Sequence, residues 1–179
     1  LGLVEILFAA LATLRREGIV VSAHFFGTSY APAGEARSAV LAAAEKAGVA
    51  DAVFEQVARL PYFSALQVTL EAGANLLFGS SDLGFTPSKI LGVQAAGQPV
   101  LALAYAGSTM AGRLEKLGLP CVLQTPSADT ALAVSATITA LRRLVAGQQP
   151  PVPPPESLSA RAVAARQLEI LASVSSAHP

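Results

Sequence analysis

Short apolar runs alternate along this chain with segments of helical periodicity, and this alternation is the feature that most constrains its fold. The apolar runs are rich in aliphatic and aromatic residues and lack a polar face, as is typical of strands buried on both sides. Strands that are separated by helices pair in parallel, because each helix returns the chain to the same edge of the sheet. The sequence therefore predicts an α/β fold with a doubly wound parallel sheet and helices on both faces, a Rossmann-like arrangement.

The order of elements follows from these patterns. The expected strands are residues 19–26, 52–55, 74–78, 100–104 and 121–124, and the expected helices are residues 3–14, 35–47, 63–70, 87–96, 110–117 and 129–145. Gly18 and Gly48 fit the position just past a helix end. A Rossmann-like unit usually begins with a strand. Because this chain begins with a helix and without Met, we expect it to be truncated at its N-terminus.

The distribution of proline divides the chain into three segments. Residues 1–147 form the expected Rossmann-like domain, and residues 148–158 form a proline-rich hinge, since consecutive prolines exclude helix and central strand. Residues 159–179 contain an amphipathic helix and a tail. The apolar stripe of that helix needs another surface to pack on.

Composition narrows the classes of partner. Twelve Lys and Arg balance twelve Asp and Glu among 179 residues, so neither nucleic acid nor an anionic membrane surface is favoured. The charge-free stretch between Lys89 and Arg113 is broken by Gly97-Gln98-Pro99, which predicts a turn rather than a transmembrane segment. A single cysteine, Cys121, with no histidines grouped around it predicts a reducing, cytoplasmic location and no metal site.

The loop after the strand at residues 74–78 is the strongest candidate site, because ligands of open α/β sheets bind at the carboxyl ends of the strands. In this loop Thr86 is a natural N-cap and Pro87 a suitable first helical residue. The N–H groups at such a helix end attract phosphate. Lys89 then falls in the first turn, where a cation opposes the helix dipole unless an anion binds there. A solvated lysine on an exposed turn is the alternative.

Other candidates lie in neighbouring loops. Gly27 and Thr28 follow the first strand without a glycine-rich dinucleotide pattern, so a plain turn is the alternative interpretation. Ser108 and Thr109 either contact the same ligand or cap the next helix, and Arg59 could reach a base or a phosphate. His24 lies within an apolar strand and is interpreted as a packed core histidine. No nucleophile set or paired carboxylates indicate hydrolysis.

Several of these segments carry a resemblance to a known family. The residues are Ala74-Asn75-Leu76-Leu77-Phe78, then Thr86-Pro87-Ser88-Lys89-Ile90-Leu91, then Ala95-Ala96-Gly97-Gln98-Pro99-Val100. In their order and spacing they resemble the C-terminal half of a GT-B glycosyltransferase, more narrowly the bacterial group-1 or family-4-like enzymes. The resemblance covers about residues 1–145. The proline-rich hinge and the last helix resemble the closing segment of that family.

The resemblance implies a UDP- or GDP-sugar donor bound in this half, with no cofactor and no required metal. It places the diphosphate near Thr86, Ser88 and Lys89, with Gly27, Thr28, Ser108 and Thr109 close by and the base near Arg59. Many family members carry two glutamates eight positions apart around this turn, the second binding the donor ribose. The matching positions here are Gly84 and Gly92.

The implied function is the donor-binding half of a glycosyltransferase with an unknown acceptor. The acceptor site and catalytic residues would belong to an N-terminal domain that this chain lacks, so the chain alone is expected to bind but not to transfer. Two alternatives are a sugar-nucleotide epimerase of the same architecture and a non-catalytic sugar-nucleotide-binding domain. Assays of transfer, interconversion and binding on the full-length protein would separate them.

Overall fold

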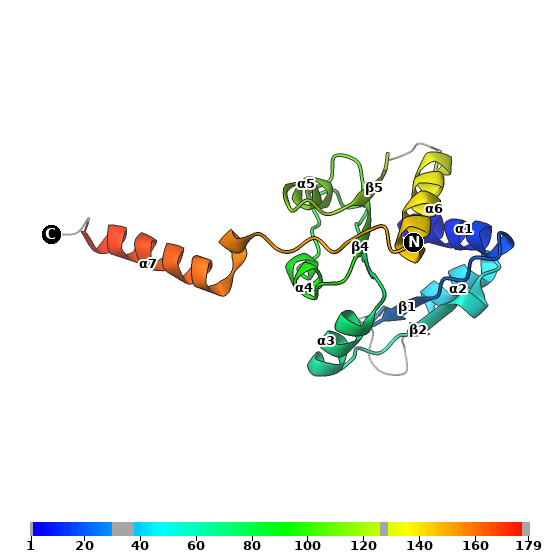
Figure 1. The fold of residues 1–179 in the computed structure, drawn as a ribbon, viewed down its shortest axis with the longest axis horizontal. Helices are drawn as coiled ribbons and strands as arrows, with labels where there is room; N and C mark the ends of the chain where they lie inside the picture. Colours follow the sequence, from blue (N-terminus) through cyan, green and yellow to red (C-terminus); the bar gives the residue numbers. More distant parts are fainter. Residues whose placement is uncertain (1, 30–37, 126–128, 177–179) are drawn as a thin grey trace.

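The structure is a computed structural model that describes residues 2–29, 38–125 and 129–176, with side chains described as far as residue 173 (Figure 1). Strands and helices alternate from the first helix to α6. The strands are β1 (Ala23–Phe26), β2 (Val53–Gln56), β3 (Asn75–Phe78), β4 (Val100–Tyr105) and β5 (Cys121–Gln124). The helices are α1 (Gly2–Arg16), α2 (Ala39–Lys46), α3 (Tyr62–Glu71), α4 (Ile90–Ala95), α5 (Thr109–Lys116), α6 (Ala131–Val145) and α7 (Ala160–Ser176), with short 3-10 turns η1 (Ala50–Ala52) and η2 (Glu156–Leu158).

All strand pairs in the described residues are parallel, which confirms the α/β prediction. The strands form a two-stranded sheet, β1–β2, and a three-stranded sheet in the order β3–β4–β5. The stacked rings of Phe25 and Phe78, 6.2 Å apart, bring the end of β1 beside the end of β3. That all five strands belong to one doubly wound sheet stays a prediction.

The three-stranded sheet separates two apolar cores. Leu101, Leu103 and Val122 lie in one cluster with residues of α1 and α6. Ala102 and Ala104 alternate with them along β4 and lie in a second cluster with residues of α4 and α5. The period of two along a strand sends neighbouring side chains to opposite faces, which explains why β4 is buried almost throughout.

The first predicted strand is wrong in its first half. Residues 19–22 are not strand, and Val20 is 88% exposed. The cause is the partner strand: β2 begins at Val53, which pairs with Ala23, so residues before Ala23 have no strand to pair with.

The interpretation of His24 as a core residue is also wrong. Ala23 is buried on the α1 and α2 side of the sheet, so the alternating His24 lies on the other face, where it is exposed against the rings of Phe26 and Phe54. Helix α3 has no buried residue, and Phe63 is 80% exposed, although its apolar stripe suggests packing. The predicted second helix begins partly outside the described residues, since residues 35–37 are not among them.

The proline-rich segment lies against the domain. The Gln149 amide donates to the carbonyl of Val100 at 2.7 Å, and the Gln94 amide donates to that of Pro153 at 3.1 Å. Val152 and Leu158 pack on the second core cluster. Beyond them α7 extends away from both sheets, with its apolar residues Leu168, Ile170 and Leu171 exposed (Figure 1). Its role as a hinge stays a prediction, and residues 177–179 of the tail lie outside the described residues.

Candidate functional site

The ends of β1 and β2 bring two predicted site residues together. Gly27 follows β1 with a φ of +68°, a left-handed conformation that favours glycine, and its N–H donates to the carbonyl of Gln56 at 2.9 Å. A Cβ at Gly27 would lie 3.3 Å from Cγ of Arg59. The loop after β2 therefore packs directly on the loop after β1.

Glu55, near the end of β2, is a residue of this edge that sequence reasoning missed. Its Oε1 accepts a hydrogen bond from the Thr28 hydroxyl at 2.5 Å, and its Oε2 accepts from the Leu41 N–H at 2.8 Å and from the Ser38 hydroxyl. Burial raises the pKa of this carboxyl, but the hydrogen bonds outweigh burial and leave the pKa below its ordinary value.

The loop between β3 and α4 differs from its prediction. The expected helix at residues 87–96 begins only at Ile90, so Thr86 is not its N-cap and Pro87 is not its first residue. The Ile90 N–H donates to the Pro87 carbonyl at 3.4 Å, which makes residues 87–90 a tight turn ahead of the helix. Lys89 occupies the N-cap position and makes no side-chain capping hydrogen bond.

A second turn shapes the same loop further upstream. Oδ1 of Asp82 accepts from the Gly84 N–H at 2.9 Å, and the Ser80 hydroxyl accepts from the Asp82 N–H at 3.1 Å. Gly79 sits where the loop leaves β3, and a Cβ there would lie 3.2 Å from Cα of Ala104. The loop thus leaves the sheet in close contact with β4.

Thr109 holds this loop against α5, and Ser108 caps that helix. Ser108 is buried, and its hydroxyl caps α5 by accepting from the Ala111 N–H at 3.1 Å. The N–H and the hydroxyl of Thr109 both donate to the Leu83 carbonyl at 2.8 Å. The capping alternative for Ser108 is therefore confirmed, and the loops after β3 and β4 form one joined surface.

The remaining predicted residues are accessible. Ser88 and Lys89 are exposed and Thr86 is half-buried. No hydrogen bond or ion pair joins the side chains of these three residues to another part of the chain that the structure describes. The structure thus brings Gly27 beside Arg59 and joins Thr109 to the loop that contains Thr86, Ser88 and Lys89.

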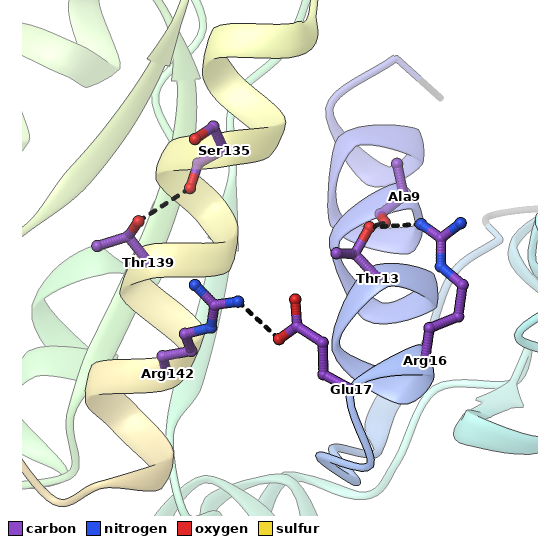
Figure 2. A network of polar contacts seen from close by, with 7 residues as sticks. All are labelled: Ala9, Thr13, Arg16, Glu17, Ser135, Thr139 and Arg142. Atoms are coloured by element: carbon purple, nitrogen blue, oxygen red, sulfur yellow. Dashed lines mark hydrogen bonds and ion pairs between the residues drawn. The ribbon is translucent and has the colours of Figure 1, made fainter.

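The opposite edge of the molecule carries a different feature. An open depression of about 780 Å³ is lined by Thr13, Arg15 and Arg16 of α1, by Gly48, and by Val134 of α6. It lies near the start of β1, because α1 ends there. Figure 2 shows Arg142 of α6 reaching across to Glu17, with 2.6 Å between Nη2 and Oε2, while Arg16 bonds the Thr13 hydroxyl at 3.0 Å.

The two arginines that line the depression, Arg15 and Arg16, already have partners. Arg15 forms an ion pair with Asp51, and the Arg16 guanidinium donates to Thr13 of its own helix. Helices α1 and α2 also end here, and the partial negative charge at their C-termini disfavours a bound anion. This depression is therefore a weaker candidate for a phosphate ligand than the carboxyl ends of the strands.

Comparison of the chain with family models, with curated proteins and with solved structures finds no match in any of the three. Within the described residues, no group of three or more His, Cys, Asp or Glu side chains is placed to hold a metal ion. Nor does the described part of the chain contain a helix long and apolar enough to cross a membrane.

Proposed function

We propose that this chain is the donor-binding domain of a glycosyltransferase and binds a nucleoside-diphosphate sugar at the carboxyl ends of its strands. The observation that supports it best is the paired donation from Thr109 to the Leu83 carbonyl, which joins the β3 and β4 loops at this edge. Parallel α/β sheets bind their ligands at this edge. The resemblance at Thr86-Pro87-Ser88-Lys89 supplies the class of ligand.

Each predicted residue has a role in this proposal. The amine of Lys89 pairs with the diphosphate, and Thr86 and Ser88 offer hydroxyl donors beside it. Thr109 acts through the loop that it holds and Ser108 through the start of α5 that it caps, since their hydroxyls already bond to Leu83 and Ala111.

The loops after β1 and β2 complete the proposed site. In this proposal the backbone at Gly27 and Thr28 lies close to the donor. Arg59, packed on Gly27, contacts the base.

The proposal extends to the whole architecture. The β1–β2 and β3–β4–β5 sheets would be two parts of one doubly wound sheet, joined where Phe25 meets Phe78. Residues 148–158 would act as a hinge toward the acceptor domain of a longer, cytoplasmic bacterial enzyme.

Calorimetric titration with UDP and GDP tests this function. We expect the parent chain to bind one of them and Lys89→Ala to bind it about tenfold more weakly, which corresponds to about 1.4 kcal/mol. Lys116→Ala is the matched control, because Lys116 is an exposed lysine at the far end of α5. It should bind as the parent does. A parent that binds neither nucleotide contradicts the proposed function, and equal losses in both variants contradict the role of Lys89.

A further inference from the structure

Glu55 uses both carboxylate oxygens to join three segments of the chain. It stands near the end of β2, and its donors are the Thr28 hydroxyl just past β1, the Ser38 hydroxyl at the N-cap of α2, and the Leu41 N–H in the first turn of α2. Thr28 and Ser38 flank the connection from β1 to α2. One side chain therefore holds both ends of that connection.

The chemistry of this contact suits a carboxylate. The Leu41 N–H can only donate, the hydroxyls of Thr28 and Ser38 donate here as well, and an ionised carboxylate accepts through both of its oxygens. A negative charge at the start of α2 also interacts favourably with the positive end of the helix. The lowered pKa of Glu55 agrees with a carboxyl that is charged in the folded protein.

The substitution Glu55→Gln tests this arrangement, because glutamine keeps the shape of glutamate but has only one acceptor oxygen. Its NH2 group would replace one carboxylate oxygen. Facing the Leu41 N–H it would lose that hydrogen bond, and facing a hydroxyl it would keep one only if the hydroxyl turned to accept, without the help of a charge. Hydrogen bonds to charged groups are also the stronger ones.

The residue that Glu55 holds belongs to the proposed donor site. Thr28 follows Gly27, which packs on Arg59. We propose that Glu55 is a positioning residue of this site: by accepting from Thr28 it fixes Gly27 and Thr28 in the conformation that the donor meets, without contacting the donor itself. This inference rests on the proposed function and extends it to a residue to which the resemblance assigns no role.

The test combines nucleotide titration with hydrogen exchange. Glu55→Gln should lower the affinity for UDP or GDP about tenfold and should raise the exchange rate of the Leu41 amide several-fold. Glu45→Gln is the matched control, since Glu45 is an exposed glutamate on α2 and the charge change is the same. It should leave both quantities at the parent values.

A double-mutant cycle separates positioning from general destabilisation. If Glu55 acts through Thr28, Glu55→Gln should cost less than about twofold in affinity once Thr28→Val is present. Full additivity of the two losses overturns the proposal. If Glu55→Gln does not fold, Thr28→Val tests the proposal by itself, because it removes the hydrogen bond from Thr28 to Glu55 and leaves the one from Leu41 in place. Lower nucleotide affinity with the Leu41 amide still protected from exchange supports the proposal. Unchanged affinity overturns it.

The outcomes also separate this inference from the function on which it rests. A parent chain that binds neither UDP nor GDP overturns the proposed function and this inference with it. A parent that binds, together with a Glu55→Gln variant of equal affinity, overturns only the role of Glu55.

Discussion

Replacing Ser108 by alanine perturbs the point where the loops after β3 and β4 meet. Ser108 is only 6% exposed, and its hydroxyl accepts from the Ala111 N–H at 3.1 Å. Alanine removes this acceptor and leaves the Ala111 N–H at the start of α5 without it. Water has little access to a residue so buried, so solvent replaces the lost hydrogen bond poorly.

The expected loss of unfolding free energy is about 1 kcal/mol, the usual effect of removing an N-cap serine. For a chain of this length that corresponds to a fall in melting temperature of about 2 to 4 °C, which thermal denaturation followed by circular dichroism resolves. Ser108→Gly should lose only a few tenths of a kcal/mol, because glycine is tolerated at N-caps.

Ser135→Ala supplies the control for this comparison. Ser135 is exposed within α6, and alanine is the better helix former there, so we expect no loss of stability. A Ser108→Ala melting temperature equal to that of the parent would refute the capping role that the structure assigns to Ser108.

Three further predictions concern single residues. Gly92→Ala should stabilise the protein by about 0.5 to 1 kcal/mol in urea denaturation, because Gly92 is helical and a Cβ there meets no atom within 4 Å. Burial raises the pKa of the Cys121 thiol from 9.0 to about 11. The unfolded chain therefore loses this proton first, and the free energy of unfolding should fall as the pH rises from 9 toward 11. Cys121→Ala should lose this part of the alkaline dependence. Glu17→Gln should lower the free energy of unfolding by less than about 1 kcal/mol, and by less still at high salt, since the side chains of Glu17 and Arg142 are 38% and 49% exposed. A larger loss would contradict this assignment of a weak, exposed ion pair.

Local patterns were sufficient to predict the order of the elements. The apolar spacing of α1, the glycine at position 18 with a φ of +79°, and the strand Cys121–Gln124 all depend on residues close in sequence, and the structure places them as predicted. The short apolar runs predicted parallel strands for the same reason.

Two of the errors arose where residues distant in sequence determine the local structure. The length of β1 depends on where β2 begins, and the exposure of His24 depends on which face of that pair the helices cover. A further error is local: Thr86 and Pro87 have the residue types of a helix start, yet a tight turn at residues 87–90 delays the helix to Ile90.

The candidate site was predictable only in part. The loops were found from the general position of ligands in α/β sheets, and Ser108 was recognised as a possible cap. Glu55 was missed because Thr28, Ser38 and Leu41 come together only in the folded chain. No local motif marks a carboxylate that accepts from residues on both sides of a connection.

The central claim is that a nucleoside diphosphate binds at the carboxyl ends of the strands. A titration of the ¹⁵N-labelled chain with UDP or GDP, followed by amide chemical shifts, tests this claim most directly. We predict that shifts concentrate at residues 27–28, 79–89 and 107–111, while Thr13 and Gly48 at the opposite edge stay unchanged. Shifts confined to the depression around Thr13 and Gly48, or no shifts with either nucleotide, would contradict the account.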